Sequence, residues 1–336
     1  SARFSVLKLR ERMFDTLTAN TLEQIRVVEE LIPVHEAVSN GKASDVRRRI
    51  KLYAVSSCVT RLYAIYENYV ETILADFLDS IPEISPYASL AAELKSDYRL
   101  GISHVLSKID HDRYSHLTHE SVVLWYHEAL TNQPKYRFVT EALIRHEQNL
   151  RLNVLETLLG RIQLSGIRTW LAHNESVTSL YTESESVFEQ LDAELRTFVQ
   201  IRNDAAHGVL DDLQGKDNLE RFCELMRSLI AAISSFLHRS LLLLRANAGR
   251  ARKIGEVTEV FQKNGAFIAQ IENAARLQKG MQIHVLGTNY CFLQKIDSIR
   301  VNDLDVEDIV AGHAAFEVGL KCAVNPRRNA ALYVDA

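Results

Sequence analysis

Glycine and proline are scarce in this sequence. Its 336 residues include 13 glycines and 5 prolines, whereas average usage is roughly 7% and 5%. Both residues interrupt regular helices, so their scarcity predicts a mainly helical chain. The glycines are also unevenly placed, with 6 in residues 1–245 and 7 in residues 246–336. This shift predicts a helical part followed by a part made of strands and turns.

Cysteine is equally scarce, and long apolar runs are missing. The four cysteines are widely spaced and form no Cys-x-x-Cys pair: Cys58, Cys223, Cys291 and Cys322. Such spacing predicts free thiols in a reducing compartment, so we expect a cytoplasmic protein. The longest apolar stretch, residues 229–244, is interrupted by His238 and Arg239 and falls short of the roughly 20 residues that span a bilayer. The charged start of the chain is unlike a signal peptide, and we expect no membrane association.

Neither sign of charge dominates the composition. The chain has 39 Lys+Arg against 43 Asp+Glu, for a formal charge of −4. A nucleic-acid partner would therefore need a local basic patch. The basic clusters at residues 47–51 and 245–253 are candidates for contacts with phosphates. Ordinary solvation of a protein surface explains either cluster equally well.

The hydrophobic pattern predicts two domains. From about residue 45 to residue 80, apolar side chains recur every three or four positions, as on a helix with one buried stripe. Further helices are expected over residues 3–38 with a break near Pro33, over shorter segments between 88 and 160, and over residues 185–206 and 219–246. After residue 253 the period falls to about two residues, which predicts strands.

We therefore expect an α+β multidomain protein. A mainly α-helical domain should occupy residues 1–250, and a small antiparallel β-barrel should occupy residues 251–336.

The fingerprints of common cofactor-dependent enzymes are missing as well. The sequence has no glycine-rich dinucleotide or phosphate-binding loop and no Gly-x-Ser-x-Gly elbow. His111, His116 and His119 are close enough in sequence to hold zinc, but a structural zinc site needs a fourth ligand. A polar loop between helices is the simpler interpretation, so we expect neither a metal nor a cofactor.

The most informative segment ends the helix expected at residues 185–206. Arg202 offers a planar, permanently charged group that can bind a phosphate, and His207 can accept and donate a proton near neutral pH. On an ideal helix, five residues at about 100° each leave the two side chains about 140° apart. They would meet if the helix end unwinds, or if each faces a second copy of the chain across a two-fold axis. An ordinary helix end, with Arg202 in a surface ion pair and His207 as a cap, fits the same spacing.

This segment resembles the signature of the HEPN superfamily, in which an arginine, often followed by asparagine, precedes a histidine by four to six residues. Here the motif reads Arg202-Asn203-Asp204-Ala205-Ala206-His207. Residues 61–71, which include Glu67, are similar to the first core helix of that superfamily. Residues 146–151, His-Glu-Gln-Asn-Leu-Arg, resemble its stand-alone prokaryotic branch found near defence and toxin systems. The resemblance covers roughly residues 40–245.

The resemblance implies a metal-independent endoribonuclease. In such enzymes the 2′-OH of the RNA attacks the adjacent phosphorus and leaves a 2′,3′-cyclic phosphate and a 5′-OH. His207 would then be the general acid and base, and Arg202 would hold the phosphoryl oxygens. Asn203 would orient the site, and Glu67 would position Arg202 or His207. The resemblance further implies a homodimer with the site between its chains.

The same resemblance implies a setting and partners. RNA is the expected partner, with tRNA or ribosomal RNA as substrates, in toxin–antitoxin growth arrest or antiviral defence in bacteria. An antitoxin or another defence protein would restrain the activity. The alternative is a non-catalytic scaffold that binds RNA or proteins in a defence complex, because inactive members of the superfamily keep the motif. A helical module that senses a nucleotide is a third interpretation.

The strand-rich part has a likeness of its own. Residues 255–260, 277–283, 295–299 and 318–320 resemble the second-domain β-barrel of translational GTPases. In those proteins such barrels contact tRNA ends or ribosomal RNA. From residue 246 onward this chain has 11 basic and 10 acidic residues, so no extended phosphate-binding face is evident. RNA contact and a role in protein docking or dimer bracing are both open.

Overall fold

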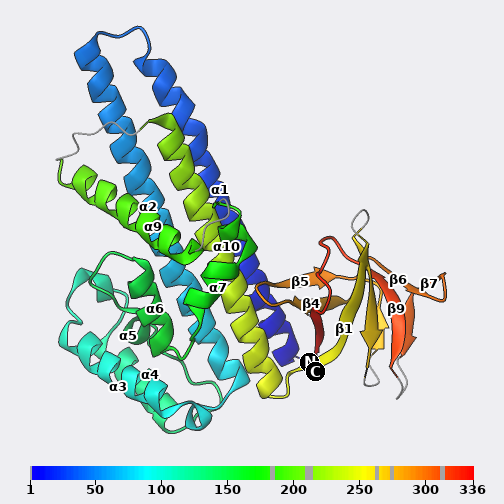
Figure 1. Ribbon diagram of the computed structural model, residues 1–336. Coiled ribbons are helices and arrows are strands. Elements are labelled where there is room, and N and C mark those ends of the chain that lie inside the picture. The colour runs from blue at the N-terminus through cyan, green and yellow to red at the C-terminus, as the bar shows by residue number, and fades with distance from the viewer. Residues whose placement is uncertain (1, 182–185, 209–214, 262–264, 273–275, 311–314) are drawn as a thin grey trace. The chain divides into compact units, whose positions relative to one another are not determined.

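The computed structural model describes residues 2–181, 186–208, 215–261, 265–272, 276–310 and 315–336. Helices precede strands, which confirms the predicted α+β class (Figure 1). The α-helices are α1 (Ala2–Ser39), α2 (Ser44–Ile84), α3 (Ala92–Ser107), α4 (His119–Leu130), α5 (Glu141–Ile144), α6 (Leu152–Arg161), α7 (Ile167–His173), α8 (Glu175–Thr178), α9 (Val187–Ala206) and α10 (Lys216–Asn247). Two 3-10 helices are η1 (Tyr87–Ser89) and η2 (Asp112–Tyr114). The strands are β1 (Ala251–Phe261), β2 (Ala266–Ile271), β3 (Arg276–Gln278), β4 (Gln282–Leu286), β5 (Cys291–Lys295), β6 (Ser298–Val301), β7 (Leu304–Val306), β8 (Asp308–Val310), β9 (Phe316–Lys321) and β10 (Ala331–Asp335).

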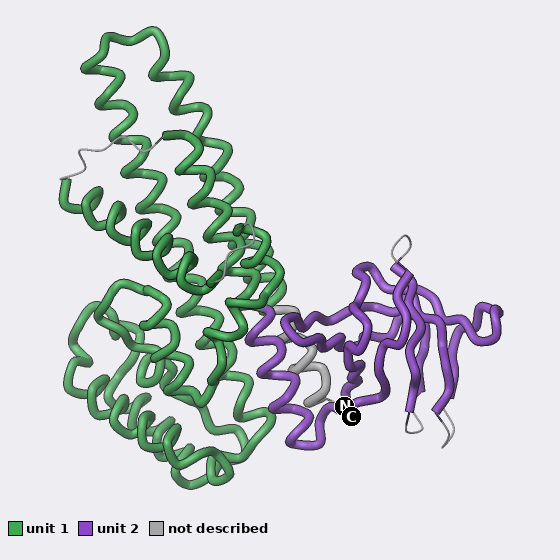
Figure 2. Tube along the Cα trace, in the orientation of Figure 1, with its two compact units in different colours: residues 1–234 green, residues 235–336 purple. Residues whose placement is uncertain are grey.

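The chain forms two compact units, residues 1–234 and residues 235–336 (Figure 2). The division falls within α10, so this helix contributes its first part to one unit and its last part to the other. The domain boundary predicted after residue 250 stays a prediction. Helix α10 ends at Asn247 and β1 begins at Ala251, so the change from helix to strand lies near that position.

A pair of long helices, α1 and α2, forms the framework of the first unit (Figure 1). The first part of α10 is joined to both. Arg227 of α10 forms two hydrogen bonds with the Glu29 carboxylate of α1, at 2.5 and 3.0 Å. On α2, the buried hydroxyl of Tyr69 donates to the carbonyl oxygen of Ile230 at 3.3 Å. These contacts align the three helices along their buried faces.

Two prolines lie inside helices, and the break predicted near Pro33 is wrong. Helix α1 continues through Pro33, and α2 continues through Pro82 to Ile84. A proline inside a helix removes one backbone hydrogen bond, but packing can compensate for it. Val28 and Ile32, in the two turns of α1 that precede Pro33, are buried. Their tertiary contacts hold the helix together where the proline removes a backbone hydrogen bond.

The segment from α3 to α6 adds a compact lobe to the helical framework (Figure 1). Its core contains clustered aromatic rings, among which Tyr98 and Phe138 meet edge to face at 5.0 Å. The Tyr98 hydroxyl also accepts the backbone N–H of Val139 at 2.9 Å. Gly101 allows α3 to approach α5 closely, because a Cβ at this position would lie 1.9 Å from the carbonyl oxygen of Ala142. The lobe is therefore fixed against the helices that it covers.

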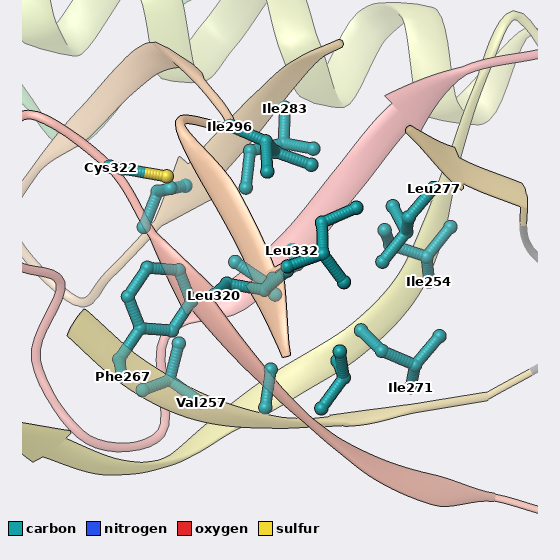
Figure 3. Packing of buried hydrophobic residues seen from close by; sticks show 14 of the residues in the cluster. Ile254, Val257, Phe267, Ile271, Leu277, Ile283, Ile296, Leu320, Cys322 and Leu332 are labelled. Carbon is teal, nitrogen blue, oxygen red and sulfur yellow. The ribbon is translucent and has the colours of Figure 1, made fainter. Parts of the chain in front are cut away.

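The second unit is an antiparallel sheet with the strand order β5-β4-β10-β1-β2-β9-β6-β7. Strands β3 and β8 form a separate ladder. Apolar residues including Ile254, Phe267 and Leu332 fill its core (Figure 3). Among the described residues, no ladder joins β5 to β7, so a closed barrel stays a prediction.

Helix α10 is long and apolar enough, by length and composition, to cross a membrane, which differs from our expectation for residues 229–244. However, 61% of its most apolar window is buried inside the protein, and core helices of folded proteins pass the same test. The four cysteines are free, as predicted, and all four are buried.

A buried ion pair joins the end of α10 to the last strand. The Arg245 side chain is 1% exposed, and its Nη2 lies 2.5 Å from Oδ1 of Asp335. Removing one member of a buried pair leaves the other charge without compensation. We expect Asp335→Ala to destabilise the second unit by about 3 kcal/mol. Hydrogen exchange of β1 and β10 peptides, followed by mass spectrometry, would measure this loss.

The matched control is Asp308→Ala, which removes the carboxylate of an exposed pair with Arg276. Exposed pairs contribute about 0–1 kcal/mol. Equal exchange in the two variants would show that the buried pair does not stabilise the sheet.

Candidate active site

Arg202 lies near the C-terminal end of α9, beside the middle of α2. The apolar face of α9, including the buried Phe198 and Val199, packs on α2 and brings its last turn to Tyr63. The guanidinium carbon of Arg202 lies 4.2 Å from the centre of the Tyr63 ring. A guanidinium over an aromatic face is attracted by the negative charge of that face. The contact fixes the plane of the Arg202 side chain.

Neutral oxygen atoms complete the surroundings of this guanidinium. Its Nη1 donates to Oδ1 of Asn203 at 3.1 Å and to Oδ1 of Asn149 at 3.3 Å. No ion pair of Arg202 is found among the described residues, and its Nε is buried there without a hydrogen-bond partner. The surface ion pair of an ordinary helix end is therefore not found in the described part of the chain. The positive charge is oriented but not neutralised.

Tyr63 contacts both Glu67 and Arg202. The Tyr63 hydroxyl donates to Oε1 of Glu67 at 2.9 Å and accepts the backbone N–H of Leu150 at 2.9 Å. Burial raises the pKa of the Tyr63 hydroxyl, so it remains a neutral donor. Glu67 and Leu150 hold the ring from one side while Arg202 stacks on its face. This arrangement links the glutamate of α2 to the arginine of α9.

His207 is the C-cap residue of α9, and its side chain is exposed. Its backbone N–H bonds to the carbonyl oxygen of Asn203 at 3.0 Å. Gly208 follows with φ +69°, the left-handed conformation in which glycine commonly ends a helix. No described contact holds the imidazole. A single chain thus gathers Arg202 and Asn203, with Glu67 behind them, and leaves His207 on the surface.

A second network lies one turn further along α2. Glu71 accepts from Arg113 at 2.8 Å, and its Oε1 lies 3.1 Å from Nε2 of His146. The other ring nitrogen of His146 faces the carbonyl oxygen of Gln148 at 2.8 Å. Both ring nitrogens therefore face acceptors, which suits the doubly protonated form. The hydrogen bond with Glu71 raises the pKa of His146, and the hydrogen bond with His146 lowers the pKa of Glu71.

Several residues of the site were missed in the sequence: Tyr63, Asn149, Glu71, Arg113 and His146. Tyr63 precedes Glu67 by four residues, so both lie on one face of a helix, and that spacing was a usable signal. Asn149 and His146 lie in the segment 146–151 that the resemblance already involved. Arg113 carried no signal, because its contact with Glu71 joins residues 42 positions apart.

Two of the three histidines considered as zinc ligands have other partners. His111 accepts the backbone N–H of Arg113 at 3.3 Å as the N-cap of η2. His116 Nε2 lies 2.6 Å from Glu141 Oε1, and His119 is the first residue of α4. Among the residues that the structure describes, no group of three or more His, Cys, Asp and Glu is placed to hold a metal ion.

A helical framework that presents an arginine, an asparagine and a histidine at the end of one helix has the architecture of a HEPN domain. The family model described as RiboL-PSP-HEPN matches residues 28–239. This match covers more than half of the chain, and the chain therefore belongs to the RiboL-PSP-HEPN family. HEPN domains are generally ribonucleases, so the family indicates an RNA-related function.

Other comparisons add little about the remaining residues. Part of the chain is similar to the crystal structure of the selenomethionine variant of the C-terminal domain of a putative U32 peptidase from Geobacillus thermoleovorans. That likeness has 20% identity and a TM-score of 0.21, and it covers 24% of this chain and 96% of the other. At this TM-score it carries no argument, so the resemblance to translational GTPases stays a prediction. No curated protein matches the chain.

The pair formed by Glu71 and His146 predicts a pH-dependent stability. Because the pKa of His146 is raised, its contribution to the free energy of unfolding is complete below pH 6.5, the ordinary pKa of histidine. That contribution is lost as the pH rises through the pKa of His146 in the folded protein. Because the pKa of Glu71 is lowered, its contribution to the free energy of unfolding is present above pH 4.5, the ordinary pKa of glutamate. That contribution is lost as the pH falls through the pKa of Glu71 in the folded protein. Both groups are charged between those limits.

We expect Glu71→Gln to lower the free energy of unfolding by about 1 kcal/mol in that window, because the partly exposed carboxylate is screened by water. The deficit should shrink as the pH rises from 6.5 through the raised pKa of His146, above which Arg113 is the charged partner that remains among the described residues. Urea unfolding followed by the fluorescence of Trp125 and Trp170 would measure it. Glu23→Gln, which removes an exposed pair with Arg26, is the control, and a deficit independent of pH would contradict the assignment.

Proposed function

We propose that this protein is a metal-independent endoribonuclease. The 2′-OH of a ribose attacks the adjacent phosphorus, the new O2′–P bond forms, and the P–O5′ bond breaks. The products are a 2′,3′-cyclic phosphate and a 5′-OH. His207 accepts the proton of the 2′-OH and returns a proton to the leaving O5′. Arg202 stabilises the negative charge that develops on the non-bridging oxygens.

The observation that carries this proposal is the state of the Arg202 guanidinium. It is held over the Tyr63 ring and bonded to two amide oxygens, and no described carboxylate forms an ion pair with it. A charge already oriented before the substrate arrives needs no reorganisation during the reaction. Asn203 supports this geometry directly, and Glu67 supports it through Tyr63. Both are positioning residues in this proposal.

The exposed position of His207 favours a site shared by two chains. The helix ends at Ala206 without unwinding before it, so Arg202 and His207 keep a separation of five residues on and just beyond the helix. On such a helix the two side chains diverge by about 140°. We propose a homodimer in which Arg202 of one chain meets His207 of the other across a two-fold axis.

The biological setting that fits this activity is growth arrest or antiviral defence in bacteria, in the cytoplasm. An antitoxin or another defence protein would restrain cleavage of host RNA, with tRNA or ribosomal RNA as substrates. The second unit would then hold or select structured RNA. These assignments rest on the family and on the proposed chemistry.

Cleavage of tRNA and total RNA in excess EDTA tests the chemistry. We expect cyclic-phosphate ends from the natural protein, a loss of about 10²–10³ in rate for Arg202→Ala and about 10²–10⁴ for His207→Ala. Arg196→Ala is the matched control, because Arg196 is exposed on the same helix and pairs only with Asp192 among the described residues. Equal rates for all four proteins would indicate a contaminating nuclease.

Mixing the two inactive variants tests the shared site. A heterodimer of Arg202→Ala and His207→Ala chains contains one site with both residues intact and one with neither. After exchange of subunits, half of the dimers are heterodimers, so activity should return to about a quarter of the natural value. A site within one chain predicts no recovery in the mixture. A strictly monomeric mass in solution would also contradict the shared site.

A non-catalytic scaffold is the second candidate function. The observation that favours it is the lack of any described contact that fixes the His207 ring. A scaffold would bind RNA or a partner protein through the same surface without producing cyclic-phosphate ends. RNA binding by the natural protein with no cleavage in any condition would favour this candidate.

A further inference from the structure

A cavity with a strongly basic lining is formed in part by the segment that also holds Arg202. It has a volume of about 580 Å³ and is bounded by α3, η2, α6 and the segment before α6. Four cationic side chains line it: Lys108, Arg113, Arg145 and Arg161. The lining also includes one carboxylate, that of Glu147. Cavities of this size hold ligands of a few hundred cubic ångströms, and an excess of positive charge selects anions.

Two of these cations have no carboxylate partner among the described residues. Arg145 Nη1 donates to the carbonyl oxygen of Ala142 at 2.6 Å. Arg161 Nη1 donates to the carbonyl oxygen of Arg145, also at 2.6 Å. Carbonyl oxygens orient a guanidinium but leave its full charge, so the cavity keeps a positive field. Burial and the charge of Arg145 lower the pKa of Arg161, which agrees with that field.

The third cation is only weakly neutralised. Lys108 Nζ lies 3.0 Å from Oε1 of Glu147, but both side chains are largely exposed, at 49% and 76%. An exposed pair of this kind opens easily, since water screens its attraction. His104, also in the lining, reports the local field. Burial lowers its pKa, and Arg145 and Lys108 lower it further.

The cavity and the proposed active site share one segment of the chain. His146 lines the cavity and contacts Glu71, whereas Asn149 bonds to Arg202. These two residues are three positions apart, which is a separation of at most about 11 Å between their Cα atoms. Arg113 also lines the cavity and binds both Glu71 and the carbonyl oxygen of His146. One short segment therefore lines the cavity through His146 and holds Arg202 through Asn149.

We propose that this cavity is a second phosphate site, which binds a backbone phosphate of the RNA strand outside the scissile position. The assignment rests on the proposed function, because it takes the strand at Arg202 as its reference. Lys108 and Arg145 contact the phosphate, and Glu147 opposes it. The cavity sets which length of strand binds and in which direction it leaves the active site.

Two charge changes of opposite sign test the site. The probe is a fluorescein-labelled 2′-O-methyl RNA of about 12 nucleotides, which has no 2′-OH nucleophile and cannot be cleaved. Lys108→Gln removes a cation and should weaken binding about threefold, with the slope of log K against log salt reduced by about 0.7. Glu147→Gln removes the opposing carboxylate and should tighten binding by a similar factor. Fluorescence anisotropy over a range of salt concentrations measures both.

The gain expected for Glu147→Gln matters most, because a folding defect does not produce tighter binding. Matched controls are Lys135→Gln and Glu93→Gln, which make the same charge changes at exposed positions outside the cavity. If the cavity variants and their controls shift binding equally, net charge alone explains the effect and the site is overturned. If Lys108→Gln leaves the salt slope unchanged, the site is overturned as well.

A small-anion experiment separates RNA from other phosphates. Inorganic tripolyphosphate bound in the cavity should raise the pKa of His104 in an NMR titration, because its negative charge favours the protonated ring. The 2′-O-methyl RNA should displace the tripolyphosphate from the cavity. Tripolyphosphate that binds without displacement by RNA would overturn the assignment in favour of a free polyphosphate ligand. The proposed nuclease activity is judged apart from this test. If His207→Ala loses cleavage but the cavity variants do not change RNA binding, only the proposed phosphate site is rejected. If Lys108→Gln and Glu147→Gln shift binding in opposite directions but the protein does not cleave RNA, only the proposed nuclease activity is rejected.

Discussion

A positive charge held in place by uncharged groups is the interaction on which the proposed site depends. The Arg202 guanidinium lies on the Tyr63 ring and bonds to amide oxygens of Asn149 and Asn203. A carboxylate would hold the side chain equally well, but it would also cancel the charge that a phosphate needs. The ring and the amides orient the group and leave the charge available. The cost of ordering a long side chain is met during folding instead of during binding.

Helix α2 ties this charge to the rest of the helical unit. Tyr63, Glu67 and Glu71 lie on successive turns of one face, so the same helix supports Arg202 and the network of His146. The segment between α5 and α6 takes part in both interactions. Its Asn149 accepts a hydrogen bond from Arg202, and its His146 contacts Glu71. A change in this segment therefore affects the arginine and the basic cavity together. In the proposed second phosphate site, the lobe from α3 to α6 is part of the binding surface and not only additional core.

The sequence predicted the elements of the site better than its geometry. The end of α9 at Ala206 and the left-handed Gly208 follow from local chemistry, because glycine ends a helix at low cost in strain. Glu67 was found through its position in a family motif, but its action through the Tyr63 hydroxyl was not. That contact depends on how the Tyr63 hydroxyl is held by the backbone N–H of Leu150, which lies 87 positions away in the sequence. The continuous helix through Pro33 was missed for the same reason, since buried neighbours outweighed a local rule.

The sequence by itself determined the class of protein, the order of helices and strands, and the residue types available for chemistry, because periodicity and short motifs are local properties. Only the tertiary structure decided which charges are neutralised and which are not. Lys108, Arg145 and Arg161 lie on separate segments, and their convergence on one cavity follows from the packing of α3 and α6. The exposure of His207 was likewise set by where α9 ends against its neighbours. Long-range packing fixes these distances, and no local pattern in the chain encodes them.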